Sequence, residues 1–234
     1  MTSEQINQYV QHLMSIHVGF LNGVPPGVSV EVKQVSRTGA SGKDLVVKYH
    51  IFVRGVPPET LFQELNWPVT AEKPSSELGG ISAGKDGLLM CTGRTEYQCG
   101  SPKKLDDPIE FTMTPRKGET YRFAFVSDEI KVPVVVVPDP IESTNRGCTL
   151  SAVRLTAKFE LAFISGSGYP PNSDVHYSVS TNDASNDFVV KSDERGIIRT
   201  GVVPYSKDQH PGIAKVKVTQ PECSPEVSFE WGKI

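Results

Sequence analysis

The chain has 234 residues, of which 38% are hydrophobic and 22% charged, so it carries enough apolar sequence for a globular core and is not of disordered composition. Its formal net charge is −3. Because no basic cluster stands out, the composition argues against nucleic acid or an anionic membrane surface as the partner. The longest apolar run, 132–137, is far shorter than the roughly 20 residues that cross a bilayer, so we expect no membrane span.

Residues 3–21 place apolar side chains at three- and four-residue steps, which predicts an amphipathic helix with Thr2 or Ser3 as its N-cap. The segment GVPPG at 23–27 then ends the helix. Three roles fit its apolar face: packing on the first domain, dimerisation, or linkage to a membrane anchor. The segment has neither the basic nor the apolar region of a signal peptide.

From Val28 onward, apolar and polar residues alternate, which is typical of half-buried strands. Two strands flank a hairpin loop at 37–43, and we expect one helical turn at 60–65 and a polar loop at 70–80. Further strands are predicted at 88–91, 109–113, 121–126 and 132–137. This spacing predicts a β-sandwich over residues 23–140.

The proline-containing stretch PDPIESTNRG at 138–147 is predicted to be a linker, with the domain boundary near residue 141. Seven short strands are expected beyond it, at 149–155, 158–164, 175–180, 188–191, 197–203, 214–219 and 227–231. That number is typical of an immunoglobulin-like sandwich. The predicted fold is therefore all-β, with an N-terminal helix at 1–22 and two tandem sandwich domains at 23–140 and 141–234.

Four cysteines permit three disulfide pairings, and their spacing favours Cys91 with Cys99 and Cys148 with Cys223. The first pair flanks a short polar loop, and the second pair brackets the C-terminal domain. The alternatives are four free thiols or a zinc site, but the chain has no Cys-x-x-Cys pair and no nearby histidine pair. Two disulfides favour an oxidising compartment, so we expect a secreted, periplasmic or cell-surface protein.

The C-terminal domain carries a sequence pattern that resembles bacterial immunoglobulin-like and fibronectin-type modules. The pattern consists of SGSGYPPNS at 165–173, ERGI at 194–197, a strand at 212–219, then Cys223 and Trp231. It covers about residues 148–232 and implies a β-sandwich that binds or supports other molecules. No tryptophan lies between the two cysteines, so their bond is expected to tie the terminal strands together. Residues 23–140 resemble no family that we can name.

Candidate catalytic patterns do not have the context that their chemistry needs. The segment 80–84 fits G-x-S-x-G, but no strand-turn-helix unit surrounds it, so we interpret it as a turn. Ser173, Asp174 and His176 share one predicted strand and cannot form a triad with one another. The five histidines are scattered and are expected to be solvated: His12, His17, His50, His176 and His210. We therefore predict no catalytic residue, no metal site and no cofactor.

Two acidic clusters are candidate ligand sites. Asn182, Asp183, Asn186 and Asp187 offer oxygen ligands for calcium, but hairpin turns select the same residues. Asp106, Asp107 and Glu110 contain the carboxylates that glycosidases use, but flanking lysines and a proline favour a solvated loop.

Exposed aromatic residues are the third candidate for a ligand site, because sugars stack on aromatic rings. Trp67 lies between two polar stretches, Tyr169 precedes two prolines, and Tyr97 lies inside the loop between Cys91 and Cys99. A disulfide-closed loop would hold Tyr97 rigid and lower the entropy cost of binding. We predict Trp67 and Tyr97 as a ligand platform.

The sequence thus predicts a non-catalytic extracytoplasmic binding or structural module whose ligand is an unknown protein or glycan. The alternative is a polysaccharide-binding accessory domain or a carbohydrate-active enzyme of the cell envelope. The oligomeric state stays open.

Overall fold

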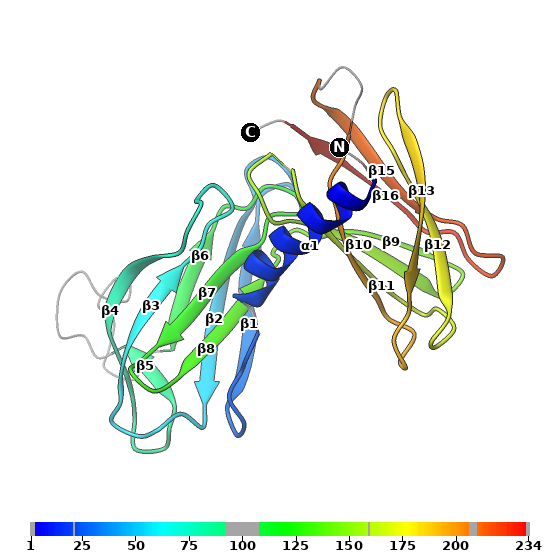
Figure 1. Cartoon of the computed structure of the whole chain (residues 1–234). Helices are drawn as coiled ribbons and strands as arrows, with labels where there is room; N and C mark the ends of the chain where they lie inside the picture. Colours follow the sequence, from blue (N-terminus) through cyan, green and yellow to red (C-terminus); the bar gives the residue numbers. More distant parts are fainter. Residues whose placement is uncertain (1–2, 21, 92–107, 159, 206–209, 233–234) are drawn as a thin grey trace. The chain divides into compact units, whose positions relative to one another are not determined.

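The structure is a computed structural model that describes residues 3–20, 22–91, 108–158, 160–205 and 210–232, with the backbone alone at 3–7, 77–79 and 91. Its elements are α1 (Ser3–Gly19), β1 (Ser29–Thr38), β2 (Val46–Arg54), β3 (Leu61–Asn66), β4 (Ser75–Ala83), β5 (Leu89–Cys91), β6 (Ile109–Met113), β7 (Tyr121–Val126), β8 (Lys131–Val136), β9 (Ile141–Asn145), β10 (Cys148–Arg154), β11 (Ala162–Ser167), β12 (Asp174–Ser180), β13 (Ser185–Lys191), β14 (Ile198–Val202), β15 (Gly212–Val218) and β16 (Glu226–Trp231) (Figure 1). The predicted helix and the all-β class are confirmed.

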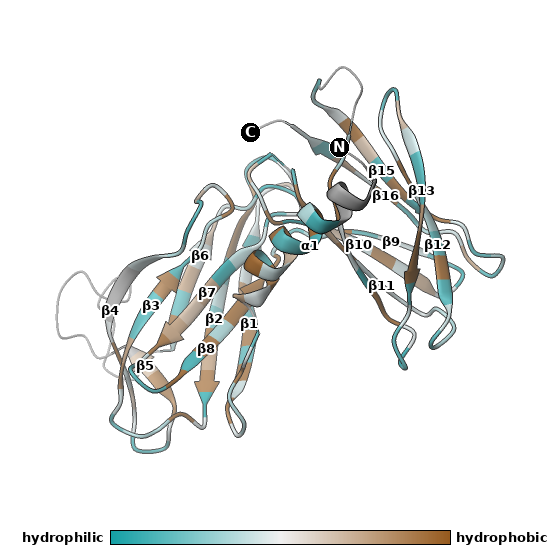
Figure 2. Ribbon diagram, viewed as in Figure 1, coloured by the Kyte–Doolittle hydropathy of each residue, from teal (hydrophilic) through white to brown (hydrophobic). Residues whose placement is uncertain are grey.

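The chain divides into two compact units. One, called here the N-terminal domain, comprises Val18–Arg116 and Thr120–Asp139. The other, the C-terminal domain, comprises Met1–His17, Lys117–Glu119 and Pro140–Ile234. Along the strands of both, apolar residues alternate with polar ones, as Figure 2 shows in brown and teal, because successive side chains of a strand point to opposite faces.

The N-terminal domain is a sandwich of two antiparallel sheets. One has the strand order β1-β2-β6 and the other the order β5-β4-β3-β7-β8. The core between them takes alternate residues of both sheets, for example Val47 and Ile51 of β2 with Phe123 and Phe125 of β7. These four side chains are at most 2% exposed. The interior is thus formed by the period-two pattern of the sequence.

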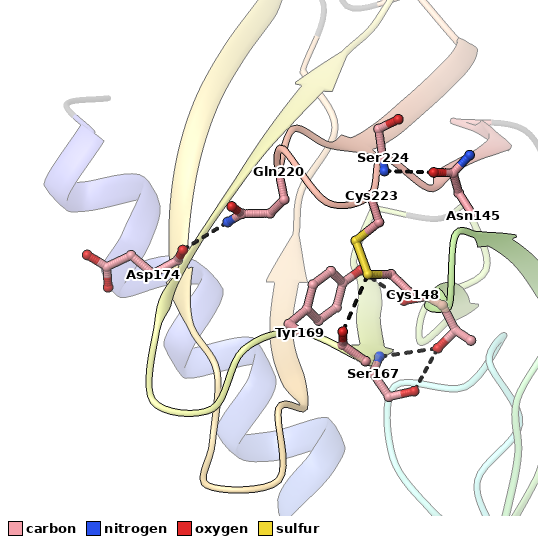
Figure 3. Close-up of a disulfide and its surroundings, with 10 residues drawn as sticks. Asn145, Cys148, Ser167, Tyr169, Asp174, Gln220, Cys223 and Ser224 are labelled. Carbon is pink, nitrogen blue, oxygen red and sulfur yellow. Dashed lines mark hydrogen bonds between the residues drawn. A yellow bond between two sulfur atoms is a disulfide. The ribbon is translucent and has the colours of Figure 1, made fainter.

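The C-terminal domain is also a two-sheet sandwich, with strand orders β14-β11-β10-β9 and β13-β12-β15-β16. Leu150 and Ile164 from the first sheet pack with Val175 and Val216 from the second. The predicted disulfide joins Cys148, at the start of β10, to Cys223, in the loop before β16. The bond therefore connects the two sheets at one end of the core (Figure 3).

Both domains follow one strand plan. In the first sheet of each domain, β1, β2 and β6 correspond to β10, β11 and β14. In the second sheet, β4-β3-β7-β8 of the N-terminal domain then corresponds to β13-β12-β15-β16 of the C-terminal domain, strand for strand and in the same order. Each domain then adds one strand of its own, β5 at a sheet edge or β9 beside β10. The same arrangement of seven strands is thus present in each domain.

The turn after the second strand is built alike in both domains. It reads GVPPET at 55–60 and GYPPNS at 168–173. The first glycines, Gly55 and Gly168, have φ of 81° and 87°. A Cβ on Gly55 would collide with the carbonyl oxygen of Gly27, and a Cβ on Gly168 with that of Gly147. Each turn therefore needs a glycine for its conformation and for the close backbone approach.

A second pair of glycines repeats this correspondence. Gly87 and Gly196 have φ of 73° and 70°. A Cβ on either would approach the carbonyl oxygen of the residue that follows the first turn glycine, Val56 or Tyr169. Two distant turns thus meet in the same way in each domain, which supports one strand plan used twice.

Helix α1 lies on the C-terminal domain through Val10 and Met14. Their side chains cover Gly201 of β14, where an added Cβ would lie 2.8 Å from an atom of each. The missing side chain at position 201 therefore makes room for the helix. Packing on the first domain is one of the three roles that fit the apolar face; up to His17, the helix instead belongs to the C-terminal domain. No helix among the described residues is long and apolar enough to cross a membrane.

Three segments differ from the prediction. The expected helical turn at 60–65 is strand β3, because its residues pair with both β4 and β7. The expected loop at 70–80 contains the start of β4, so Ser82 of the G-x-S-x-G pattern lies in a strand. The expected linker at 138–147 contains β9, which pairs with β10 and gives the C-terminal domain eight strands instead of seven. All three segments form strands because they pair with neighbouring strands, although none of them shows clear apolar alternation in its sequence.

Candidate functional site

Hydroxyl side chains cover the outer face of the sheet β14-β11-β10-β9. Thr149 and Ser151 point outward from β10 because their neighbours Cys148, Leu150 and Ala152 fill the core. The same alternation along β11 turns Ser165 and Ser167 outward. The two central strands therefore present a floor of four short polar side chains.

One row across this face runs from a cation to a carboxylate. The strand registers place Arg199 of β14 beside Ser165, Ser165 beside Ser151, and Ser151 beside Glu142 of β9. Neighbouring strands are about 4.8 Å apart, so the row extends over roughly 14 Å. Two hydroxyls thus lie between a guanidinium at one side and a carboxylate at the other.

Together these residues line a shallow pocket of about 320 Å³. The floor is low because serine and threonine are small, whereas the longer Arg199 and Glu142 stand at its sides. Phe163 of β11 also lines it and adds an aromatic surface. The size falls at the lower end of the range found for small-molecule sites.

The floor hydroxyls hold one another in place across the two strands. Ser151 Oγ lies 2.8 Å from Ser165 Oγ, and Thr149 Oγ1 lies 2.9 Å from Ser167 Oγ. Each hydroxyl can donate one hydrogen bond and accept two, so each pair keeps capacity for a ligand. A molecule with many hydroxyl groups matches that capacity.

Arg199 is oriented by the loop before β14. Its Nη1 donates to Asp193 Oδ2 at 3.2 Å. The other carboxylate oxygen of Asp193 accepts the backbone N–H groups of Ile197 and Arg195, each at 2.9 Å. These hydrogen bonds lower the pKa of Asp193, and the bond from the Ile197 N–H has the largest effect. The carboxylate therefore stays ionised and can hold the guanidinium of Arg199.

Tyr169 lies beneath this face and is not the exposed aromatic that we considered. It is 4% exposed, and its hydroxyl donates to the carbonyl oxygen of Thr149 at 2.9 Å. The bond ties the turn after β11 to the start of β10, beside the disulfide (Figure 3). Tyr169 therefore supports the floor of the pocket from below.

Removing this hydroxyl in Tyr169→Phe is expected to lower the free energy of unfolding by about 0.5–1.5 kcal/mol, because one buried hydrogen bond is lost while the ring is kept. Urea unfolding of both proteins measures the difference. An unchanged stability would contradict the supporting role of the hydroxyl.

The same residue predicts an alkaline loss of stability. Burial raises the pKa of Tyr169 to about 12. Above a pH of about 10 the unfolded chain loses this proton while the folded domain keeps it, so stability is fully present below about 10 and falls as the pH rises toward 12. Burial also raises the pKa of Tyr177, so Tyr169→Phe should make the fall shallower without abolishing it. Urea unfolding of the unaltered chain and of Tyr169→Phe at about pH 9 and about pH 11 tests this. If the free energy of unfolding falls by the same amount in both proteins between these pH values, the prediction is wrong.

Trp67 packs inside the N-terminal domain, so the predicted platform does not form there. The ring is 3% exposed and meets Phe20 edge-on, with the centroids 5.3 Å apart. The guanidinium of the fully buried Arg122 lies 4.4 Å from the centre of the ring. Burial lowers the pKa of Arg122 to about 10, which leaves it charged at neutral pH. A ring covered in this way cannot stack on a ligand. Tyr97, the other platform residue, lies outside the described residues.

The remaining sequence candidates do not converge on a site. His12, His176 and His210 are exposed as expected, but His17 is only 9% exposed, and His50 Nε2 lies 3.2 Å from Glu110 Oε2. Glu110 also pairs with Lys48, and its predicted neighbours Asp106 and Asp107 lie outside the described residues.

The calcium candidates are separated by the strand pattern. Asn186 and Asp187 lie in β13 and point to opposite faces, while Asn182 and Asp183 precede that strand. Across the described part of the chain, no group of three or more His, Cys, Asp or Glu side chains is placed to hold a metal ion.

Of the two predicted disulfides, Cys148–Cys223 is confirmed, with the Cα atoms 6.1 Å apart. The pairing of Cys91 with Cys99 stays a prediction, because Cys99 and the Cys91 side chain are outside what the structure describes.

Comparisons with known proteins give this site no family. No family model matches the chain, and no curated protein does. Among solved structures, the crystal structure of red sea bream transglutaminase aligns with 90% of this chain at 8% identity and a TM-score of 0.25. The chain spans 32% of that protein. So weak a likeness carries no argument about fold or function.

Proposed function

We propose that this chain is a non-catalytic extracytoplasmic binding protein, that its C-terminal domain is an immunoglobulin-like module, and that the pocket on the face of β14-β11-β10-β9 binds a glycan. The observation that carries the glycan proposal is the row Arg199, Ser165, Ser151 and Glu142 across four adjacent strands. Sugars present alternating hydroxyl donors and acceptors, which this row can complement over more than one sugar ring.

The shape and composition of the pocket support binding. Phe163, which lines the pocket, offers an apolar surface for the C–H face of a sugar. Among the described lining residues, Glu142 is the one carboxylate, whereas glycoside hydrolysis generally uses a pair. The arrangement therefore supports recognition rather than hydrolysis at this place.

The disulfide supports an extracytoplasmic location, since such bonds form and persist in oxidising compartments. The Greek-key strand order of the C-terminal domain supports the immunoglobulin-like class, because sandwiches of this class have seven to nine strands in two antiparallel sheets.

A glycan array probed with the whole chain tests the proposal, followed by calorimetric titration of the strongest binder. In Ser151→Val/Ser165→Val the floor loses two hydroxyls while keeping strand-forming residues. Losing about 1–3 kcal/mol of hydrogen bonding should weaken binding by about 5-fold to about 150-fold.

Ser228→Val is the matched control, because Ser228 is exposed on the outer face of the other sheet of the same domain. It should bind like the unaltered chain. Equal weakening in both variants, or no glycan bound at all, would contradict the proposal.

A further inference from the structure

Strand β13 lies at the edge of its sheet and exposes apolar side chains. In the order β13-β12-β15-β16, β12 is the one described strand that is hydrogen-bonded to it. Phe188 is 38% exposed and Val189 54%. An open edge of this kind offers unpaired backbone groups to another strand.

The pairing with β12 shows which backbone groups of β13 point outward. At one end of the pairing between the two strands, the N–H of Thr181 donates to the carbonyl oxygen of Ala184 at 2.8 Å. At the other end, the N–H of Ser192 donates to the carbonyl oxygen of Ser173 at 2.9 Å. Hydrogen-bonded and non-hydrogen-bonded pairs alternate between these ends. The odd-numbered residues from 185 to 191 therefore direct N–H and C=O away from β12, toward the open edge.

The charges of β13 are complementary to a second, antiparallel β13. If the two strands pair about Val189, Asp187 of each lies opposite Lys191 of the other. All three residues are odd-numbered, so their outward backbone groups meet as hydrogen-bonded pairs. Phe188 then lies opposite Val190, which covers apolar surface that one copy leaves exposed.

We propose that two copies of this chain associate edge to edge through β13, forming one continuous eight-stranded sheet with Val189 on the two-fold axis. A two-fold axis needs a self-complementary surface, and this register supplies one. Moving the axis to residue 187 would place Asp187 against itself, a like-charge pair that destabilises sheets. The sequence of β13 thus favours one register. The proposal is independent of the glycan site.

Sedimentation equilibrium of the whole chain, with Val189→Pro as the first variant, tests the association. Proline removes the outward N–H at the centre of the interface, and edge strands accept it because that N–H does not face β12. We expect a monomer–dimer equilibrium for the unaltered chain and a loss of dimer in the variant.

Ser228→Pro is the control for this substitution. Ser228 lies in β16, the other edge strand of the same sheet, and is paired with Lys215 of β15. The N–H of Val218 donates to the carbonyl oxygen of Pro225, and alternation from that pair makes Ser228 and Lys215 a non-hydrogen-bonded pair. The N–H of Ser228 therefore points away from β15, as that of Val189 points away from β12. Ser228→Pro should keep the dimer. A dimer that persists in Val189→Pro, or a chain that is monomeric at every concentration, would overturn the proposal.

Charge reversal tests the register itself. Lys191→Asp places two like-charge pairs in the interface and should raise the dissociation constant about tenfold. Asp187→Lys should do the same, whereas the double variant restores both pairs with opposite sense and should restore the dimer. High salt should weaken the unaltered dimer and strengthen each single variant's association. A double variant as weak as the single ones would contradict this register.

Discussion

Removing the Cys148–Cys223 disulfide by changing both cysteines to alanine is expected to lower the stability of the C-terminal domain by about 4.5 kcal/mol. The bond closes a loop with a sequence separation of 75 residues. In the chain-entropy model, a cross-link over such a loop restricts the unfolded state by this amount. It is a large share of the stability of an ordinary domain.

Native-state hydrogen exchange measures this effect for each domain separately. Amides of β12 and β15 should lose protection in the double alanine variant, while those of β3 and β7 serve as an internal control and keep theirs. Both cysteines are also buried, each residue being 3% exposed, so the alanines leave small cavities that add to the loss. Unchanged protection in β12 and β15 would show that the packed core alone holds the two sheets together.

Alanine at the first glycine of either repeated turn should destabilise its domain strongly. Gly55→Ala and Gly168→Ala each combine a positive φ, which costs a non-glycine residue about 1–2 kcal/mol, with a collision against a backbone carbonyl. Relieving the collision requires backbone shifts that cost about 1–3 kcal/mol more.

The chain supplies its own controls for this comparison. Gly27 and Gly147 have φ of 82° and 88°, nearly those of the turn glycines, but nothing lies within 4 Å of a Cβ built on either. Gly27→Ala and Gly147→Ala should therefore show the conformational cost alone. Urea unfolding of the four variants should give the same order in both domains. If each control is as unstable as its partner, the close backbone approach contributes nothing.

The sequence was sufficient for the elements whose pattern is local. The amphipathic helix, the strands with apolar alternation and the Cys148–Cys223 bond all follow from residue spacing. Strands β3, β4 and β9 were missed because their residues become strands by pairing with neighbours, and polar residues such as Ser75 and Ser76 gave no alternation to detect. Side-chain packing and pairing override weak local preference in such segments.

The common strand plan leaves one signal in the sequence, in the two turns. GVPPET at 55–60 and GYPPNS at 168–173 share a glycine, two prolines and a following polar pair, but the strands around them share little sequence. The similarity lies in backbone conformation: Glu59 and Asn172, four residues after each glycine, have φ of 59° and 53°. A comparison of turns, rather than of whole strands, would have found it.

The candidate site could be predicted only in part. Alternation along the predicted strand at 149–155 is enough to put Thr149 and Ser151 on its solvent side, but nothing in the sequence marks two short hydroxyl residues as a ligand site. The row itself depends on strand order, because Glu142 and Arg199 are brought to opposite sides of the same two serines by pairings distant in sequence. Trp67 has polar flanks in the sequence, but the flank before it is strand β3, and the one after it is a turn whose Ala71 carbonyl oxygen accepts the N–H of the buried indole ring.

The most direct test of glycan recognition is chemical-shift mapping of the whole chain by NMR during titration with the glycan that binds best on an array. The account predicts that shifts concentrate on the amides of β10 and β11, around Ser151 and Ser165, and at Arg199 in β14. Shifts confined to the other sheet of the C-terminal domain or to the N-terminal domain would contradict it.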